Sequence, residues 1–491
     1  MKAITRRSFL NRTAVTGLGL FAARGLRPST WAASAGANDA IRIGVIGLGG
    51  KGWQHMKLLS RRKDTRVVAV CDLDPKNLAR ARDELAGDQV APFATTDARQ
   101  LLARDDVDAV FVVTGNHWHA LLSVWACQAG KDVYVEKPMT HTVWEGRKLI
   151  EAAAKYRRVV QVGTQYRSES GLAAGIQWLH EGHLGKLKHV HCLYLARRGS
   201  IGRRRPWYPD GIDYDMFCGP TPVVPLERDK LHYDWHWSWA TGNGEIGNNG
   251  VHLLDIARRI VRSEAPPRRV LGVGGRFVVD DVAETPNTHL AVYDYPAAPV
   301  IFEARALPAK PDVSYSDQIN GTRVGVVAHC EGGYIAGLVG CAAYDPSGKV
   351  IQKFGGDGGG ATHLNNFLAA VRSRRAQDLA APPEIGHGSA GLCHFGNISL
   401  RVGAPAAPAE IEKALEPVPA AMAMNRAMMA HLGVHGVDLA KQPLTLGTWL
   451  DLEPSWDGIA QIGAANPALL ERARYLVHEV QRPPFAIPEV V

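Results

Sequence analysis

A glycine-rich turn near the start of the chain has the pattern of a nucleotide phosphate site. The apolar run 41–46 leads into Gly47-Leu48-Gly49-Gly50-Lys51-Gly52, which fits G-x-G-x-x-G. In this pattern Gly47 permits a tight turn, Gly49 lets the backbone approach a pyrophosphate, and Gly52 allows close helix-to-strand packing. The helix that follows would point free N–H groups at the phosphates. Asp72 closes the next apolar run at the spacing of a ribose-binding carboxylate, so the segment predicts a dinucleotide site.

A tryptophan-rich segment has the side chains that a sugar ring needs. Asp234-Trp235-His236-Trp237-Ser238-Trp239 runs into a glycine-rich polar stretch that ends at Asn249. Tryptophan faces stack on the C–H faces of a polyhydroxylated ring, and Asn, His and Glu side chains pair with its hydroxyl groups. We therefore expect a sugar or polyol ligand, although a purely structural role for the tryptophans stays open. The predicted contacts are Tyr166, Arg167, Trp237, Asn248 and His252.

Composition argues against other classes of ligand. Six of the eight net positive charges lie in residues 1–37, and the remaining arginines are scattered, so we expect no nucleic-acid partner. Histidine pairs such as His117/His119 and His232/His236 lack a carboxylate or thiol cluster to complete a metal site, and we expect no metal. The seven cysteines are widely spaced without a CxxC pair, which predicts buried thiols.

The spacing of apolar runs predicts the elements that hold the glycine turn. Between residues 38 and 165, β-type runs alternate with helical patterns, which indicates a doubly wound parallel sheet, the Rossmann arrangement. The predicted strands are 42–46, 66–71, 109–114, 132–135 and 159–162, and helices are expected at 75–85 and 142–155. Sites in such sheets lie beyond the carboxyl ends of the strands.

Residues 166–404 predict a second domain, of the α+β class, within a chain that is α/β as a whole. Helices are expected at 171–181, 363–374 and 390–402, and strands at 188–194, 269–279, 288–293, 300–304, 325–329 and 333–338. The hairpin-like turns between these strands favour a largely antiparallel open sheet with helices on one face. We expect the open face to form a homodimer or homotetramer. Residues 405–491 are a C-terminal extension with helical patches at 409–415 and 467–480.

Residues 1–37 predict a signal for export by the twin-arginine route. Arg6-Arg7-Ser8-Phe9-Leu10 precedes a modest apolar stretch, and Ala33-Ser34-Ala35 fits a cleavage site. The stretch 14–23 is too short and too glycine-broken to span a bilayer of about 30 Å, so we expect no stable membrane insertion. The expected location is the periplasm. A disordered basic tail and an uncleaved anchor stay open as alternatives.

Two further signatures join the glycine turn. Val135-Glu136-Lys137-Pro138 closes the fourth predicted strand, and Gly250-Val251-His252-Leu253-Leu254-Asp255 opens a helix. Together with Asn116-His117-Trp118-His119, these residues resemble the Gfo/Idh/MocA family, named after glucose-fructose oxidoreductase, inositol dehydrogenase and a rhizopine-catabolism protein. The resemblance covers roughly residues 40–400, and the tail that ends Arg482-Pro483-Pro484-Phe485 is similar to the exported bacterial branch of that family.

The resemblance implies a nicotinamide-dependent oxidoreductase that acts on a sugar or polyol. Asp72 favours NAD over NADP because a carboxylate repels a 2′-phosphate, although NADP stays possible. Outside the cytosol no free NAD pool is expected, which favours a tightly held cofactor. The implied cofactor-binding residues are Gly47, Leu48, Gly49, Gly52, Asp72, Thr114, Asn116, His119, Glu136, Lys137 and Gln165.

The resemblance also implies Lys137 and His252 as catalytic residues. Hydride transfer from a carbinol carbon requires the hydroxyl proton to leave, and a histidine with a pKa near neutrality is a suitable base. A lysine beside the cationic ring of the cofactor can have a lowered pKa and would polarise the alcohol.

Two positions depart from the family pattern. Many members carry an aspartate where this chain has Asn248, which cannot accept a proton. Asp255, on the same helical face as His252, is therefore our third catalytic candidate, as a partner that orients the imidazole. An ion pair within the helix is the alternative for Asp255. Gly115 stands where proline is frequent, which leaves that turn less rigid.

Two other functions stay open. One is an NAD-dependent glycosidase or lyase that oxidises the sugar transiently and returns the hydride; Lys137 argues against it, because such members resemble a version without the E-K-P sequence. The other is a non-catalytic sugar-binding protein, for which Asn248 argues.

The twin-arginine pattern generates the first prediction. Replacing both arginines by lysine (R6K/R7K) should hold the protein in the cytosol, because the export route reads the arginine pair itself. Cell fractionation of wild type and variant, each with a cytosolic and a periplasmic marker, measures this. Equal periplasmic recovery of both would contradict the signal.

Overall fold

The computed structural model describes residues 40–87, 91–463 and 466–491. The predicted export signal lies outside them. Within the described residues, no helix is long and apolar enough to cross a membrane. All seven cysteines are buried free thiols, as predicted.

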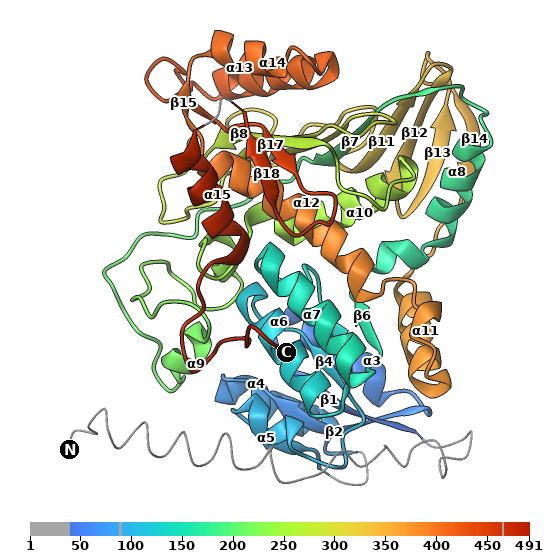
Figure 1. The fold of residues 1–491 in the computed structure, drawn as a ribbon, viewed down its shortest axis with the longest axis vertical. Helices are drawn as coiled ribbons and strands as arrows, with labels where there is room; N and C mark the ends of the chain where they lie inside the picture. Colours follow the sequence, from blue (N-terminus) through green and yellow to red (C-terminus); the bar gives the residue numbers. More distant parts are fainter. Residues whose placement is uncertain (1–39, 88–90, 464–465) are drawn as a thin grey trace.

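The apolar runs of the N-terminal domain form a parallel sheet with the order β3-β2-β1-β4-β5-β6, seen in the lower part of Figure 1. Its strands are β1 (Ile41–Ile46), β2 (Thr65–Cys71), β3 (Phe93–Thr95), β4 (Ala109–Val112), β5 (Asp132–Val135) and β6 (Val160–Val162). They read as continuous apolar runs because helices cover both faces of the sheet. The predicted doubly wound sheet is confirmed; β3 is too short to have been recognised.

Five helices connect these strands. They are α3 (Gly50–Ser60), α4 (Pro75–Leu85), α5 (Ala98–Leu102), α6 (Asn116–Gln128) and α7 (Val143–Tyr156). The strand order reverses between β1 and β4, since β2 lies on one side of β1 and β4 on the other. At such a switch point the connecting helices diverge and leave a crevice at the carboxyl ends of the strands.

The rest of the chain builds a second, larger sheet, in the upper part of Figure 1. Its strands are β7 (Leu187–Tyr194), β8 (Arg269–Gly275), β9 (Thr288–Tyr293), β10 (Val300–Arg305), β11 (Val324–Cys330), β12 (Gly333–Leu338), β13 (Gly340–Tyr344), β14 (Val350–Phe354), β15 (Ala404–Ala406), β16 (Leu444–Leu446), β17 (Leu450–Leu452) and β18 (Ile459–Ile462). Strands β7 and β10 pair in parallel, whereas the other pairs are antiparallel. The predicted antiparallel character is confirmed.

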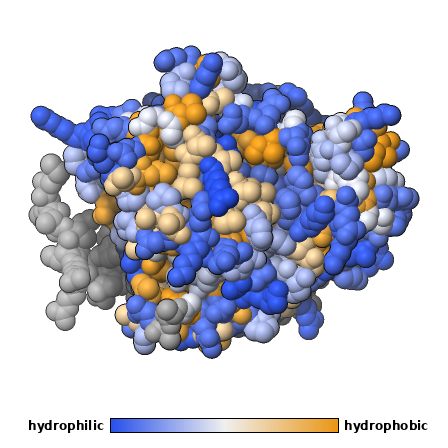
Figure 2. Space-filling model, turned by 90° about the horizontal axis from the view of Figure 1, so that it is seen from above, coloured by the Kyte–Doolittle hydropathy of each residue, from blue (hydrophilic) through white to orange (hydrophobic). Residues whose placement is uncertain are grey.

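The second half of the chain also forms helices. They are η1 (Gln165–Ser168), α8 (Ser170–His180), α9 (Tyr214–Cys218), η2 (Asp234–Trp237), η3 (Ile246–Gly250), α10 (Val251–Ile260), α11 (Gly360–Ser373), η4 (Ala376–Asp378), α12 (Pro383–Arg401), α13 (Pro408–Leu415), α14 (Pro419–Val434) and α15 (Pro467–His478). Helices α10 and α12 share the main core with the sheet. Helices α13 and α14 instead cover the opposite face over β8, β9 and β10. Seen from that end, hydrophobic and hydrophilic patches alternate on the surface (Figure 2).

Two late segments return to the N-terminal domain. Phe367 of α11 packs edge-on against Phe111 of β4, with ring centroids 5.7 Å apart, so α11 completes the core of the parallel sheet. Phe485, Ile487 and Val491 pack against α6 and α7. The extension from residue 405 therefore contributes to both domains: it adds strands to the large sheet and covers one side of the parallel sheet.

Candidate active site

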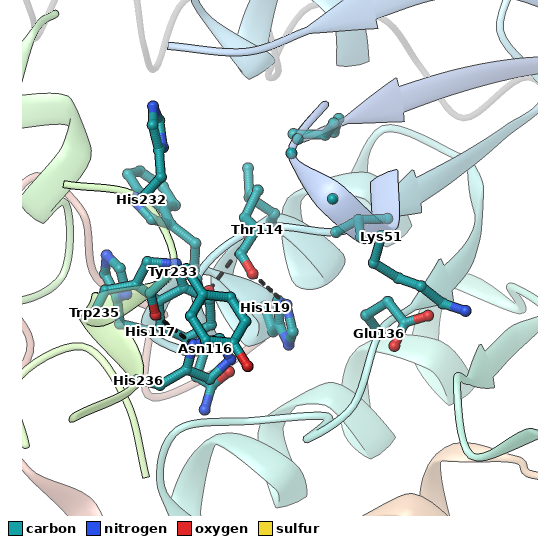
Figure 3. Close-up of a pocket in the computed structure, with 18 of the residues that line it drawn as sticks. Lys51, Thr114, Asn116, His117, His119, Glu136, His232, Tyr233, Trp235 and His236 are labelled. Atoms are coloured by element: carbon teal, nitrogen blue, oxygen red, sulfur yellow. Dashed lines mark hydrogen bonds between the residues drawn. The ribbon is translucent and has the colours of Figure 1, made fainter. Parts of the chain in front are cut away.

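A cavity of about 600 Å³ lies between the carboxyl ends of the parallel strands and the second domain. In Figure 3, Lys51 and Glu136 lie on one side of it, with Tyr233, Trp235 and His236 on the other. The cavity brings together most of the residues that the sequence predicted: Gly47, Gly49, Asp72, Thr114, Asn116, His119, Glu136, Lys137, Gln165, Tyr166, Asn248 and His252. The predicted residues that do not line it are Leu48, Gly52, Arg167, Trp237 and Asp255.

The glycine turn meets the steric demands of a phosphate cradle. Gly47 has φ +90°, and a Cβ there would lie 2.2 Å from the carbonyl oxygen of Val113. A Cβ on Gly52 would lie 1.9 Å from the carbonyl oxygen of Gly47, whereas a Cβ on Gly49 would meet nothing within 4 Å. Helix α3 starts there without a side-chain cap, so its first N–H groups remain available to an anion. The turn fits a pyrophosphate.

Asp72 and Leu48 act as a unit behind this turn. The Asp72 carboxylate accepts hydrogen bonds from the backbone N–H of Leu48 (2.6 Å) and of Asp74 (2.8 Å). Burial raises the pKa of Asp72, and these hydrogen bonds oppose that rise. The Leu48 side chain is fully buried in the domain core. Asp72 thus fixes the turn and still faces the cavity, as a ribose-binding carboxylate must.

Glu136 lies at the floor of the cavity in a buried ion pair. Its Oε1 lies 2.8 Å from Nε2 of His55, one helical turn beyond Gly52. Burial by itself would raise the pKa of Glu136, but the hydrogen bond and charge of His55 outweigh burial and hold this pKa well below its usual range. Glu136 is therefore ionised. Sequence reasoning missed His55, which stands in no motif quoted above and is brought to Glu136 only by the fold.

Lys137 follows Glu136 and reaches across to the second domain. Its Nζ donates to the backbone oxygen of Asn248 (2.5 Å) and to Oδ1 of the same residue (3.2 Å). Burial lowers the pKa of Lys137, although Glu136 and Glu245 oppose that effect. The Nδ2 of Asn248 is buried without a hydrogen-bond partner among the described residues. The Lys137 amine thus joins the two domains through two hydrogen bonds, and both acceptors, on Asn248, are uncharged.

His252 lies beside this pair and differs from the sequence expectation. Burial and the charge of Lys137 lower the pKa of His252 to about 3, so the imidazole is neutral rather than poised near pH 7. Tyr166 packs edge-on against it, with ring centroids 5.0 Å apart, and no described residue bonds its Nδ1. The carboxylate of Asp255 is instead held by Arg167 (2.9 Å) and Ser389 (2.6 Å). Asp255 is thus placed as the centre of a buried polar cluster behind the cavity.

Two histidines of α6 hold the cavity walls through backbone carbonyls. The ring nitrogens of His119 lie 2.7 Å from the Pro138 oxygen and 3.1 Å from the Thr114 oxygen, which ties together the chain segments that follow β4 and β5. His117 contacts the carbonyl oxygens of Phe217 (2.8 Å) and Thr241 (3.2 Å) in the second domain. Their nitrogens therefore position backbone. No group of His, Cys, Asp and Glu among the described residues is arranged to hold a metal ion.

Trp237 was predicted to contact the substrate, but its neighbours in the sequence line the substrate side of the cavity. Trp237 is buried beneath Arg198, whose guanidinium lies 5.5 Å from its ring centroid, so it is not free to stack on a ligand. The rings of Trp235 and His236, with centroids 3.6 Å apart, face the cavity instead, beside Tyr233. The reason is local: residues 234–237 form a 3₁₀ turn, so side chains that alternate in sequence do not alternate in direction.

Comparison with known proteins finds one matching family and several curated relatives. Residues 41–164 match the family described as "Oxidoreductase family, NAD-binding Rossmann fold" (GFO_IDH_MocA). An inositol 2-dehydrogenase of Gluconacetobacter diazotrophicus is 37% identical over 160 residues, which are 32% of this chain and 47% of that protein. A glycosyl hydrolase family 109 protein of a Shewanella species (strain ANA-3) is 31% identical over 215 residues, 40% of this chain and 47% of that protein. The chain thus spans about half the length of these curated relatives.

A solved structure shares the fold over most of the chain. The WlbA dehydrogenase of Bordetella pertussis, crystallised with NADH and UDP-GlcNAcA, superposes with a TM-score of 0.51 and 18% identity. The match covers 72% of this chain and 94% of that one.

The glycine turn generates a paired prediction. G49A should leave the melting temperature within a few degrees of wild type and weaken NAD binding about tenfold or more, because the added methyl group occupies open space where the phosphates bind. G52A should destabilise the fold, because its methyl group overlaps the Gly47 carbonyl. Thermal unfolding and calorimetric titration separate the two effects. Equal losses of stability would refute the assignment of distinct roles.

Proposed function

Since residues 41–164 of this chain belong to the Gfo/Idh/MocA oxidoreductases and form their NAD-binding domain, we propose that the protein is an NAD-dependent oxidoreductase of sugars or polyols. It transfers a hydride between a hydroxyl-bearing carbon and a tightly bound nicotinamide cofactor. The observation that carries the proposal is the arrangement of Lys137, Asn248 and His252 in the same cavity as the glycine turn.

The cofactor and the chain have separate tasks. When bound, NAD supplies the carbon that accepts or returns the hydride. The glycine turn and Asp72 would hold its phosphates and a ribose, and Glu136 would offer an ionised acceptor further along the cavity. What remains for the protein is the proton of the substrate hydroxyl, which must leave as the carbon is oxidised.

Lys137 is the better placed group to accept that proton. A neutral amine has two N–H donors and one lone pair, and Asn248 accepts from the amine at both of its oxygens. The lone pair is then left for the substrate hydroxyl. Because Asn248 is uncharged, it does not stabilise the ammonium form as an aspartate would. His252 is neutral, and its Nδ1 has no hydrogen-bond partner among the described residues, so it is suited to orient the hydroxyl by a hydrogen bond.

The shape of the substrate side supports a sugar or polyol. Tyr166, Tyr233 and Trp235 present aromatic surface, while Asn248 Nδ2 and His252 Nδ1 are buried polar atoms without a hydrogen-bond partner in the part of the chain that the structure describes. A ligand with hydroxyl groups on an apolar ring satisfies both features. The inositol 2-dehydrogenase similarity agrees with this class. We further propose that the enzyme acts in the periplasm and as a homo-oligomer.

A second candidate function has one observation in its favour. The similarity to a glycosyl hydrolase family 109 protein fits a redox-neutral glycosidase or lyase that oxidises the sugar transiently. The two are separated by their products: the dehydrogenase leaves reduced nicotinamide after a free aldose or polyol is added, whereas the glycosidase cleaves an aryl glycoside without net reduction.

The first test is the cofactor itself. Protein purified from the periplasm and then denatured should release NAD in near one-to-one amount, measured by absorbance and mass spectrometry. The recovery of no nucleotide, together with no binding of added NAD or NADP, would contradict the oxidoreductase proposal and favour a non-catalytic sugar-binding protein.

Removal of the Lys137 amine gives a further prediction. K137M should lower kcat/KM for oxidation of the sugar about a thousandfold while NAD remains bound, since general acid–base groups contribute about 10²–10⁴-fold. K63M, at an exposed lysine, is the matched control. Normal turnover by K137M would exclude Lys137 from the chemistry; sugar binding without turnover in wild type would identify a pure binder.

The pH dependence of the rate gives another prediction. A base must be deprotonated to act, so the rate of sugar oxidation should rise with pH through the pKa of Lys137, below its ordinary value of about 10.4. N248D should move this rising limb to higher pH by about one unit or more, because the new carboxylate stabilises the ammonium form. Rate profiles from pH 5 to pH 10 measure both. A limb near pH 6.5 that disappears in H252N would instead make His252 the base.

A further inference from the structure

We propose that Arg482 is a positioning residue that holds the outer wall of the cavity closed, and that residues 479–491 are a clasp that retains the bound cofactor. The inference rests on the proposed function, because it concerns how tightly that cavity holds NAD. It explains within one chain how a cofactor stays bound in a compartment without a free pool.

The wall in question belongs to the second domain. Ile212, Met216 and Phe217 line the cavity, and they lie in or beside the short helix α9 (Tyr214–Cys218). This helix sits within residues 195–233, a long connection that has no strand of a sheet. Such a segment has little core of its own, so its position depends on the contacts made to its outer side.

On its inner side, the wall is joined to the NAD-binding domain at three points. The indole N–H of Trp118 donates to the carbonyl oxygens of Met216 and Phe217, each at 3.1 Å, and His117 contacts the Phe217 oxygen at 2.8 Å. Further along, His232 pairs with Asp74 at 2.9 Å, directly beyond β2. A nucleotide that enters or leaves the cavity across this wall must separate these contacts.

On its outer side, the wall is held by Arg482. The Arg482 N–H donates to the Pro220 oxygen (2.8 Å), and its Nε lies 3.1 Å from the oxygens of both Gly219 and Thr221. The two terminal nitrogens of the guanidinium reach the side chain (2.8 Å) and the backbone oxygen (3.0 Å) of Asp215. One planar, five-donor side chain thus fixes the whole turn 215–221, a task that a lysine cannot perform.

The clasp itself is anchored on the NAD-binding domain. Gln481 donates to Glu145 of α7 (2.7 Å), and Lys148 of α7 donates to the Glu489 oxygen (2.6 Å). Phe485 is buried and packs edge-on against Trp118, with ring centroids 5.5 Å apart. Since Trp118 lines the cavity and also holds the wall, Phe485 supports the ring that joins the two. The clasp therefore joins the NAD-binding domain to the outer side of the wall, and Trp118 joins the inner side of the wall to the same domain.

The test measures release of the cofactor from the full-length protein. The protein is loaded with isotope-labelled NAD, excess unlabelled NAD is added, and the label that remains bound is followed by mass spectrometry. R482A should release NAD about tenfold faster than wild type, R482K should fall between them, and F485A should also release faster. The matched control is R474A, because Arg474 likewise donates to backbone oxygens (Ile459 and Ala460), and none of these three residues lines the cavity.

Hydrogen exchange of the cofactor-free protein gives a readout that does not need NAD. In R482A, the amides of residues 212–221 should exchange faster, whereas those of β1 and β4 should be unchanged, which also shows that the variant is folded. Equal release and equal exchange in R482A and R474A would overturn the proposal. Wild type that binds no NAD at all would defeat the proposed function, and faster exchange of residues 212–221 in R482A would still support Arg482 as the residue that positions the wall.

Discussion

The rest of the site depends on the contact between Gly52 and the carbonyl oxygen of Gly47. Because position 52 has no side chain, α3 can start directly against β1 at a separation that a Cβ would forbid. The uncapped end of the helix then faces the cavity, and His55, one turn later, reaches Glu136. Glu136 in turn precedes Lys137. A steric condition at one backbone atom therefore places the phosphate cradle and the histidine partner of Glu136, whereas Glu136 and Lys137 themselves follow strand β5.

Burial decides the chemistry of the groups that this geometry brings together. The imidazole of His252 is kept neutral, and the pKa of the Lys137 amine falls, because the charged forms of both lose solvation. The hydrogen bond and charge of His55, together with the charges of Lys51 and Lys137, lower the pKa of Glu136 against the effect of burial. Asn248 acts in the same direction as burial, because this uncharged partner does not stabilise the ammonium form and leaves the pKa of Lys137 low. The departure from the usual aspartate is thus compatible with catalysis and does not by itself indicate a binder.

The chain after residue 355 gives the N-terminal domain contacts that its own 125 or so residues do not supply. Helix α11 adds Phe367 to the core of the parallel sheet, and residues 479–491 cover α6 and α7. The domains are consequently linked at several points around the cavity, so that a ligand between them is enclosed by segments distant in sequence. The proposed retention of a cofactor therefore rests on this whole arrangement and not on the glycine turn alone.

The resemblance to a family predicted Lys137 and His252 in one site, and the sequence by itself determined the parallel sheet, the glycine turn and Asp72. These features depend on local patterns: buried strands are continuous apolar runs, and the turn requires glycine at fixed positions. Only the tertiary structure decided that Trp235 and His236, rather than Trp237, face the cavity, since Trp237 is buried beneath Arg198 of another segment. It also decided the partners of Glu136, Asp255 and Arg482, which lie 81, 134 and more than 260 residues away in the chain. Such contacts have no local signal, because they arise from packing of complete elements, and the same packing sets the pKa values through burial.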